Sequence, residues 1–387
     1  MPENPFLVRR IKLHYGEKPP SLKETSLSVS VGVILIILLG VSIFFGTWKK
    51  KDLAKKERTV EIVSGVTHKI DEANSIFSLN PVRARELVAE AKSLLLASSE
   101  SDLDVGLRED ITNRIKKAEE KILGEYEASP QVFLDLSLVN PNFNSVDISA
   151  AKEKVFIVDA SQKQVVEVNL VSKRSEVVAG PDQLGGASQV ITASEYLFFV
   201  SNAGVLDGAG AVVINRSWDS DVLGVFYNGN LYLVEGGASK IYRFSGVGTG
   251  STKKFAEGTM WLKDGAWEGN NKINSFLADG FLWVLTSQGE ILKFSLGNRI
   301  GFNLKGMNFT DFKPSKLYTS EELTSLYLLD TQNGKVFVVS KNGDYQAQYT
   351  SNDIKDALGL VVSETYKRVF LLTPSKLIYF DLTHLEN

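Results

Sequence analysis

The chain contains no cysteine and only three histidines among its 387 residues. The absence of cysteine excludes disulfides, thiol catalysis and cysteine-ligated zinc, although it does not identify the compartment. The histidines are His14, His68 and His384, and none of them falls within the hairpins described below. Histidine-based triads and histidine-ligated metals therefore have no plausible location there, and we expect each histidine to be an exposed polar residue.

Positive and negative charges nearly balance over the whole chain, and one segment, residues 25–48, has none. The net charge of −3 predicts no general attraction to nucleic acid, and 43% hydrophobic residues are typical of globular proteins.

Residues 1–24 are a polar, proline-containing tail, whereas residues 25–48 carry no charge at all. About 20 apolar residues in a helix cross a bilayer, so we predict a single transmembrane helix over residues 25–48, which makes the membrane a partner. A buried core helix and a cleaved signal peptide are the alternatives, but the run is long and no Ala-x-Ala site follows it.

The orientation of this span is ambiguous in the sequence. Five basic residues precede it, and six follow it within eleven residues: Lys49, Lys50, Lys51, Lys55, Lys56 and Arg58. The positive-inside rule taken alone favours a cytoplasmic C-terminal part. Short N-terminal arms nevertheless commonly stay inside, and large following domains translocate with little regard to charge. We therefore favour a C-terminal part outside the cytoplasm and keep the reverse orientation open.

Residues 49–128 have helical periodicity and predict a small helical stalk or bundle. Three apolar stripes recur at spacings of three and four residues, and Asn80-Pro81 reads as an N-cap followed by proline at the first helical position. Residues 80–96 resemble one arm of a tetratricopeptide-type helical pair. A partner-binding helical module is the alternative to a structural stalk.

Residues 129–387 carry six hairpins, each with two apolar runs joined by a polar turn. The hairpins are Val155–Leu170, Leu197–Ile214, Leu231–Phe244, Leu282–Phe294, Leu326–Val339 and Val369–Phe380. Their starts lie 42, 34, 51, 44 and 43 residues apart, close to the ~40–50 residues of a four-stranded propeller blade. A further apolar run precedes each hairpin, as in Ile273–Ala278, and predicts the innermost strand. Together these patterns predict an all-β six-bladed propeller.

The two ends of this region fit one another. The last blade lacks an outer strand, and Gln131–Leu138 is a spare apolar run before the first blade. Pairing them would close the ring and hide both free edges, so we predict a propeller closed by an N-terminal strand. The pattern resembles the broad group of NHL, YVTN and quinoprotein-like β-propellers over about residues 131–383. The whole layout is similar to the extracytoplasmic half of bacterial transmembrane signalling proteins, without the cytosolic kinase or phosphatase domain, which implies a place in the envelope but no activity.

Few residues in the repeats suggest chemistry. Asp147, Asp221, Asn274 and Asp356 lie near the starts of inner strands, where a carboxylate metal site would need them, but they form no motif. Asp159, Glu235 and Asp330 recur at equivalent hairpin positions, and recurrence indicates a turn role. We predict no catalytic residue, no metal and no cofactor, and hence that the chain is not an enzyme. A carboxylate-metal propeller hydrolase is kept as an alternative.

One long connection breaks the repeat between the third and fourth hairpins. Residues 255–271 hold Trp261 and Trp267 among glycines and charges, and two surface indoles would form a contact patch. We predict that Trp261, Trp267, Lys263 and Asp264 bind a protein or glycan; the alternative is that both indoles cover a contact between blades. The resulting hypothesis is a membrane-anchored sensor or envelope scaffold outside the cytoplasm, with a cytoplasm-facing scaffold as the second hypothesis.

Overall fold

The computed structural model describes residues 22–193, 196–247, 254–269, 272–306 and 311–386. The described residues divide into two compact units, one within residues 22–75 and 86–115 and the other within residues 76–85 and 116–386. Most of the predicted polar tail over residues 1–24 lies outside the described residues. The boundaries predicted at residues 48 and 128 stay predictions.

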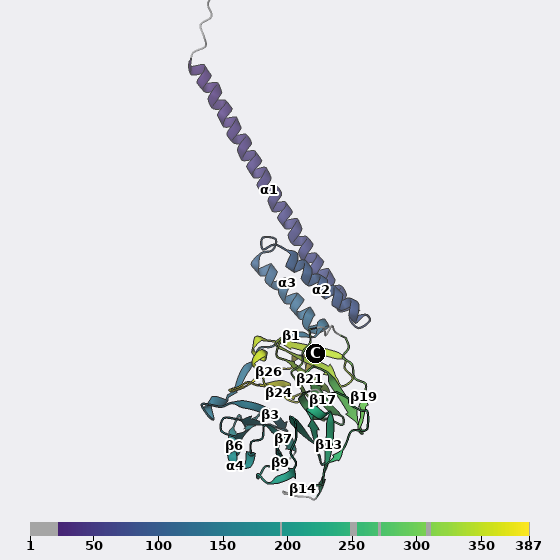
Figure 1. Ribbon diagram of the computed structural model, residues 1–387. Coiled ribbons are helices and arrows are strands. Elements are labelled where there is room, and N and C mark those ends of the chain that lie inside the picture. Colours follow the sequence, from purple (N-terminus) through teal and green to yellow (C-terminus); the bar gives the residue numbers. More distant parts are fainter. Residues whose placement is uncertain (1–21, 194–195, 248–253, 270–271, 307–310, 387) are drawn as a thin grey trace, which may run out of the picture. The chain divides into compact units, whose positions relative to one another are not determined.

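The first unit is helical and begins with one long helix. α1 (Leu22–Ile76) runs without interruption through the predicted span and the first stalk stripe (Figure 1). α2 (Pro81–Ala97) starts at the predicted proline, and Asn80 caps it by accepting the Arg83 backbone N–H at 3.1 Å. α3 (Val105–Ala118) is followed by a short π-helix, η1 (Glu119–Leu123), which belongs to the second unit. Lys69 pairs with Glu90, and Arg114 pairs with Asp71 at 3.2 Å, so α1 is tied to both of the shorter helices.

The second unit contains six antiparallel blades of four main strands, as predicted. Blade 1 is β3 (Ser145–Ala151), β4 (Lys154–Asp159), β5 (Gln164–Asn169) and β6 (Ser175–Ala179); blade 2 is β7 (Gln189–Ala193), β8 (Tyr196–Ser201), β9 (Gly204–Asp207) and β10 (Val212–Asn215). Blade 3 is β11 (Val222–Tyr227), β12 (Asn230–Glu235), β13 (Lys240–Val247), β14 (Lys254–Phe255) and β15 (Thr259–Met260); blade 4 is β16 (Ile273–Ala278), β17 (Leu282–Thr286), β18 (Ile291–Ser295) and β19 (Asn298–Ile300). Blade 5 is β20 (Lys316–Tyr318), β21 (Ser325–Asp330), β22 (Lys335–Ser340) and β23 (Tyr345–Thr350); blade 6 is β24 (Gly359–Ser363), β25 (Arg368–Leu372), β26 (Lys376–Asp381) and β2 (Gln131–Asp135). Short helical turns connect some of them: η2 (Leu136–Leu138), α4 (Pro181–Leu184), η3 (Gly236–Ala238), η4 (Asn352–Asp356) and η5 (Thr383–Leu385).

The inner strands form a closed circle. Each of β3, β7, β11, β16, β20 and β24 contacts the next, and β24 contacts β3 again, so the first and last blades lie side by side (Figure 1). β2 pairs antiparallel with β26, with Val132 opposite Ile378 and Asp135 opposite Lys376. This pairing confirms the predicted closure, in which an N-terminal strand supplies the missing outer strand of the last blade.

Two details of the hairpin prediction are corrected. The segment predicted as the second hairpin holds three strands, β8, β9 and β10, because two turns divide it, one after Ser201 and one after Asp207. In addition, β1 (Glu125–Glu127) pairs in parallel with β23 and gives blade 5 a fifth strand. Three residues are too few for a period-2 pattern, so β1 left no signal in the sequence.

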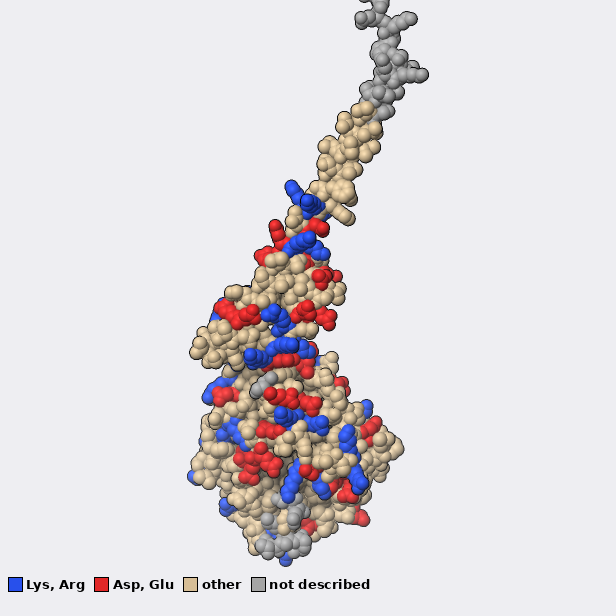
Figure 2. Space-filling view, turned by 180° about the vertical axis from the view of Figure 1, so that it is seen from behind, with Lys and Arg blue, Asp and Glu red and all other residues tan. Residues whose placement is uncertain are grey.

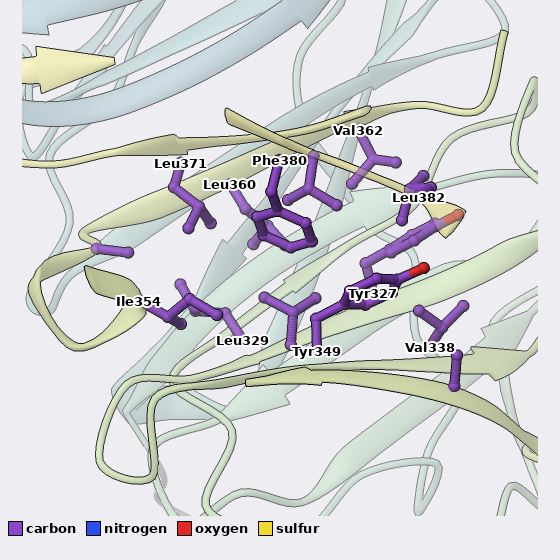
Figure 3. Packing of buried hydrophobic residues seen from close by; sticks show 14 of the residues in the cluster. Tyr327, Leu329, Val338, Tyr349, Ile354, Leu360, Val362, Leu371, Phe380 and Leu382 are labelled. Atoms are coloured by element: carbon purple, nitrogen blue, oxygen red, sulfur yellow. The ribbon is translucent and has the colours of Figure 1, made fainter. Parts of the chain in front are cut away.

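Apolar side chains of neighbouring blades pack against one another and form layers between the blades. The cluster between blades 5 and 6 includes Tyr327, Tyr349 and Phe380, all buried, with aliphatic side chains from β21 to β26 around them (Figure 3). Tyr126 of β1 stacks on Tyr349 with a ring separation of 5.1 Å, so the added strand also extends this core. At about 25 cal/mol per Å² of buried apolar surface, such layers account for most of the stabilisation of the ring.

Candidate functional site

The long connection of blade 3 packs onto the propeller through its backbone. β15 pairs with β13, the Trp261 N–H donates to the Ile241 carbonyl at 2.8 Å, and the Lys263 N–H donates to the Gly297 carbonyl at 2.9 Å. The segment therefore bridges blade 3 and the β18–β19 turn of blade 4. Residues 270–271 of the predicted patch lie outside the described residues.

The two predicted indoles take different positions. Trp267 is buried and its ring lies 5.9 Å from that of Phe294, within the core between blades 3 and 4. Trp261 is half-buried, with its ring edge-on to Tyr232 at 5.6 Å. This placement follows the alternative stated above, in which the indoles cover a contact between blades. A binding role for the four residues stays a prediction, and burial leaves Trp267 the least surface for it.

Several exposed side chains nevertheless surround Trp261. Lys263 and Asp264 are exposed, as is Met260, which directly precedes the indole. Leu296, next to the Gly297 that accepts the Lys263 N–H, is 82% exposed and has a φ of 50°. A leucine in the left-handed region is uncommon, and an exposed apolar one carries both a conformational and a hydration cost. We refer to Met260, Trp261, Lys263, Asp264 and Leu296 as the blade 3–4 surface.

The four candidate metal-site residues do not assemble. Asp221 and Asp356 are exposed and lie outside the inner strands, whereas Asp147 is in β3 and Asn274 is in β16. Asp147 accepts the Val190 N–H at 3.0 Å, and burial raises the pKa of its carboxyl to about 6, although nearby Lys316 and the hydrogen bonds oppose the rise. Among the described residues no three His, Cys, Asp or Glu side chains are grouped to hold a metal.

Polar side chains of the inner strands instead bind the neighbouring blade. Gln189 exchanges two hydrogen bonds with the Gly224 backbone, and Ser275 accepts the Leu317 N–H at 2.9 Å. The Lys316 ammonium donates to the Asn274 carbonyl at 3.0 Å. These contacts satisfy polar groups at the centre of the ring and join blades 2 to 3 and 4 to 5.

A buried ionic network lies at the other ends of the inner strands. The fully buried Asp279 carboxylate accepts the Trp283 indole N–H at 2.7 Å and pairs with Lys341 at 2.9 Å. The Lys293 ammonium donates to the Lys341 carbonyl and lies 4.0 Å from the centre of the Phe281 ring. Burial lowers the pKa of Lys293, while Asp279 acts in the opposite direction. The contacts of this network join blades 4 and 5, which gives the network a structural role.

The predicted turn role of the recurring acidic residues is confirmed for two of them. Asp159 accepts the Asn144 and Ser161 N–H groups, and Asp330 accepts the Lys313 and Asn333 N–H groups, all near 3.0 Å. Both carboxylates are fully buried at the end of the second strand of their blade. Glu235 occupies the same place in blade 3 and is also buried.

His384 differs from the prediction that each histidine is exposed. It lines a pocket of about 440 Å³ together with Tyr126, Ser325 and Gln346, and its Nδ1 lies 2.7 Å from the Tyr349 hydroxyl. The Tyr349 oxygen also accepts the His384 backbone N–H at 3.0 Å, so this hydroxyl contacts both the backbone and the ring of His384. Desolvation lowers the pKa of His384 to about 4, although Glu364 opposes this shift. The lowered pKa keeps the imidazole neutral at pH 7. His68 is exposed, as predicted, and His14 lies outside the described residues.

No family model matches the chain, and no curated protein matches it. Many solved structures share the propeller. A protein described as a putative gluconolactonase is 10% identical, with 67% of this chain and 95% of that one covered and a TM-score of 0.47. A gluconolactonase from Xanthomonas campestris is 10% identical, with 66% and 89% covered and a TM-score of 0.46. The calcium-binding protein regucalcin from Agrobacterium tumefaciens is 13% identical, with 66% and 94% covered and a TM-score of 0.43.

These structures overturn one prediction. The shortage of histidine and cysteine led to the prediction that the chain is not an enzyme, yet two of the solved propellers reported above are described as a gluconolactonase and a putative gluconolactonase. That prediction was wrong because it took the absence of certain catalytic residues as the absence of catalysis, which the fold does not exclude. The chain is a six-bladed β-propeller preceded by helices, one of which is long and apolar enough to cross a membrane.

Proposed function

We propose that the chain is a membrane-anchored β-propeller that binds a protein partner on the outer side of the cytoplasmic membrane. The single observation behind this proposal is the surface of α1. Its most apolar 18-residue window has a mean hydropathy of 2.4 and is entirely unburied within the chain. Figure 2 shows no Lys, Arg, Asp or Glu on this part of the helix. A continuous apolar helix surface of this length is matched by hydrocarbon rather than by water.

The orientation is part of the proposal and rests on general rules. A domain as large as the propeller translocates with little regard to flanking charge. The six basic residues after the span favour the opposite orientation, so a direct test is needed.

The test uses the full chain in its native membrane. We expect it to stay in the membrane after alkaline carbonate extraction, and we expect added protease to degrade the propeller in spheroplasts without lysis. Release by carbonate would contradict the anchor. A propeller that is degraded only after lysis would contradict the outward orientation and support the cytoplasm-facing alternative.

We assign partner binding to the blade 3–4 surface. Leu296 and Met260 offer exposed apolar contacts beside the charged Lys263 and Asp264, a combination typical of protein interfaces. The strained φ of Leu296 also supports this assignment, because strained residues cluster at functional sites.

A photo-crosslinking residue at position 296 tests this assignment, with position 171 as the control, because Val171 is an exposed residue of blade 1. We expect a discrete protein adduct at 296 that is absent at 171 and lost when Lys263 and Asp264 are changed to alanine. An adduct formed equally at both positions would contradict the assignment. A glycan adduct would change the partner class from protein to carbohydrate.

A further inference from the structure

A dense group of basic side chains follows the apolar part of α1 immediately. We define the basic collar as Lys49, Lys50, Lys51, Lys55, Lys56 and Arg58. All six are exposed, and only two carboxylates, Asp52 and Glu57, lie among them. Figure 2 shows the first lysines directly at the end of the uncharged helix surface.

The helix geometry places the collar at a bilayer surface. α1 is continuous, so each residue adds about 1.5 Å along the axis and the collar extends for about 15 Å beyond Trp48. A head-group layer is about 5–8 Å thick on each side of the hydrocarbon, and the Debye length is about 8–10 Å. Lys49 to Lys51 would therefore lie within the head groups, and Lys55 to Arg58 would lie within the range of their charge.

The collar surrounds the helix on several sides. At 100° per residue, Lys51, Lys55 and Arg58 share one side of α1, whereas Lys49 and Lys56 share the side nearly opposite. An amphipathic helix that lies flat on a membrane would instead carry its cations on one side. Charges on opposite sides suit a helix that passes through the head-group layer and meets lipids all around.

We propose that the basic collar binds anionic lipid head groups in the leaflet on the propeller side of the span. Lys and Arg side chains beside a span attract anionic phospholipids. Of the six cations, Arg58 also acts within the chain, because its charge helps to lower the pKa of Asp102. The inference rests on the proposed membrane anchor and adds the chemistry of the lipid to it.

Trp48 supplies the probe for this proposal, since it is 65% exposed, stacks on Phe44 at 5.9 Å and directly precedes the collar. The full chain is reconstituted in phosphatidylcholine vesicles that contain equal mole fractions of either brominated phosphatidylcholine or brominated phosphatidylglycerol. Bromine quenches only an indole that contacts the lipid, and a Trp48→Phe variant gives the emission of the other four tryptophans.

We expect brominated phosphatidylglycerol to quench Trp48 with an affinity on the order of fivefold higher than brominated phosphatidylcholine. The ratio of the two affinities should fall toward one when all six collar residues are changed to glutamine, and also in 1 M salt. The matched control changes six exposed propeller lysines to glutamine and should keep the preference; they are Lys152, Lys163, Lys240, Lys254, Lys272 and Lys313. Asp52→Asn with Glu57→Gln should raise the preference.

The outcomes separate the collar from the anchor. Equal quenching of the unaltered chain by the two brominated lipids would overturn the lipid proposal while leaving the span in place, and the cations would then act only during membrane insertion. No quenching by either lipid would overturn the span and, with it, the collar.

Discussion

The molecule has two kinds of apolar surface, one inside the propeller and one on α1. Leu328 and Trp283 are fully buried in the propeller, whereas Ile36 and Phe45 on α1 are 71% and 63% exposed. The propeller blades cover each other's apolar faces, so the apolar side chains of this unit are buried within the unit itself. The α1 surface has no such cover within the described chain, which fits the membrane anchor proposed above. Changes that destroy one surface should therefore leave the other intact.

The largest expected effect is the loss of the closing strand. Deleting Gln131–Leu138 removes β2 together with the buried Phe133 and Leu136, and it leaves β26 as an open edge. We expect no cooperative thermal transition of the propeller by circular dichroism. Membrane association of the same chain should persist, because α1 is unchanged. A wild-type transition would contradict the closure of the ring by β2.

A leucine pair compares the two surfaces directly. Leu328→Ala should lower the free energy of unfolding of the propeller by about 2–5 kcal/mol, the usual cost of a cavity in a packed core. Leu35→Ala, at a residue that is 61% exposed, should leave it unchanged. Leu35→Arg should instead weaken membrane insertion, by about 3 kcal/mol. Chemical denaturation and membrane fractionation measure the two effects, and a propeller destabilised by Leu35→Ala would show that the α1 surface is part of the protein core.

The buried turn carboxylates should matter less than a core leucine. Asp330→Ala leaves the N–H groups of Lys313 and Asn333 without their acceptor, which should cost about 2–3 kcal/mol in the unfolding free energy. The control is Asp353→Ala, at an exposed aspartate of the same blade region, with an expected change under about 0.5 kcal/mol. Equal effects of both substitutions would argue against the turn role.

A smaller effect should depend on pH. The pKa of Asp147 is about 6 in the folded protein, above its value of about 3.8 in the unfolded chain, so the folded state binds the proton more tightly. The stability that this group contributes is complete below about pH 4 and is lost as the pH rises through 6. Asp147→Asn keeps a carbonyl oxygen for the Val190 N–H and should stabilise the propeller by about 2 kcal/mol at pH 7, but not at pH 4. A gain that is the same at both pH values would contradict the raised pKa.

The repeat explains why much of the fold could be predicted. Six hairpins at a spacing of one blade, and a last blade that lacks one strand, require a partner strand, and the only spare apolar run was Gln131–Leu138. β1 had no such requirement, since blade 5 was already complete without it. A counting argument therefore finds the strand that completes a repeat and misses one that is added to it.

The candidate site was less predictable for a physical reason. Tryptophan is common both at interfaces and in cores, and the sequence does not distinguish Trp261, which is half-buried, from Trp267, which is buried. Leu296 lies in the turn between β18 and β19 with a φ of 50°, and only the following Gly297 indicated a turn there in the sequence. The Asp279–Lys341 pair joins residues 62 positions apart, so no local pattern could connect them.

The most direct test of the two-surface account compares the full chain with a chain that lacks residues 25–48. We predict that the full chain sediments with membranes, whereas the shortened chain is found in the soluble fraction and has the same propeller unfolding transition. A shortened chain that still sediments with membranes, or that loses the transition, would contradict the account.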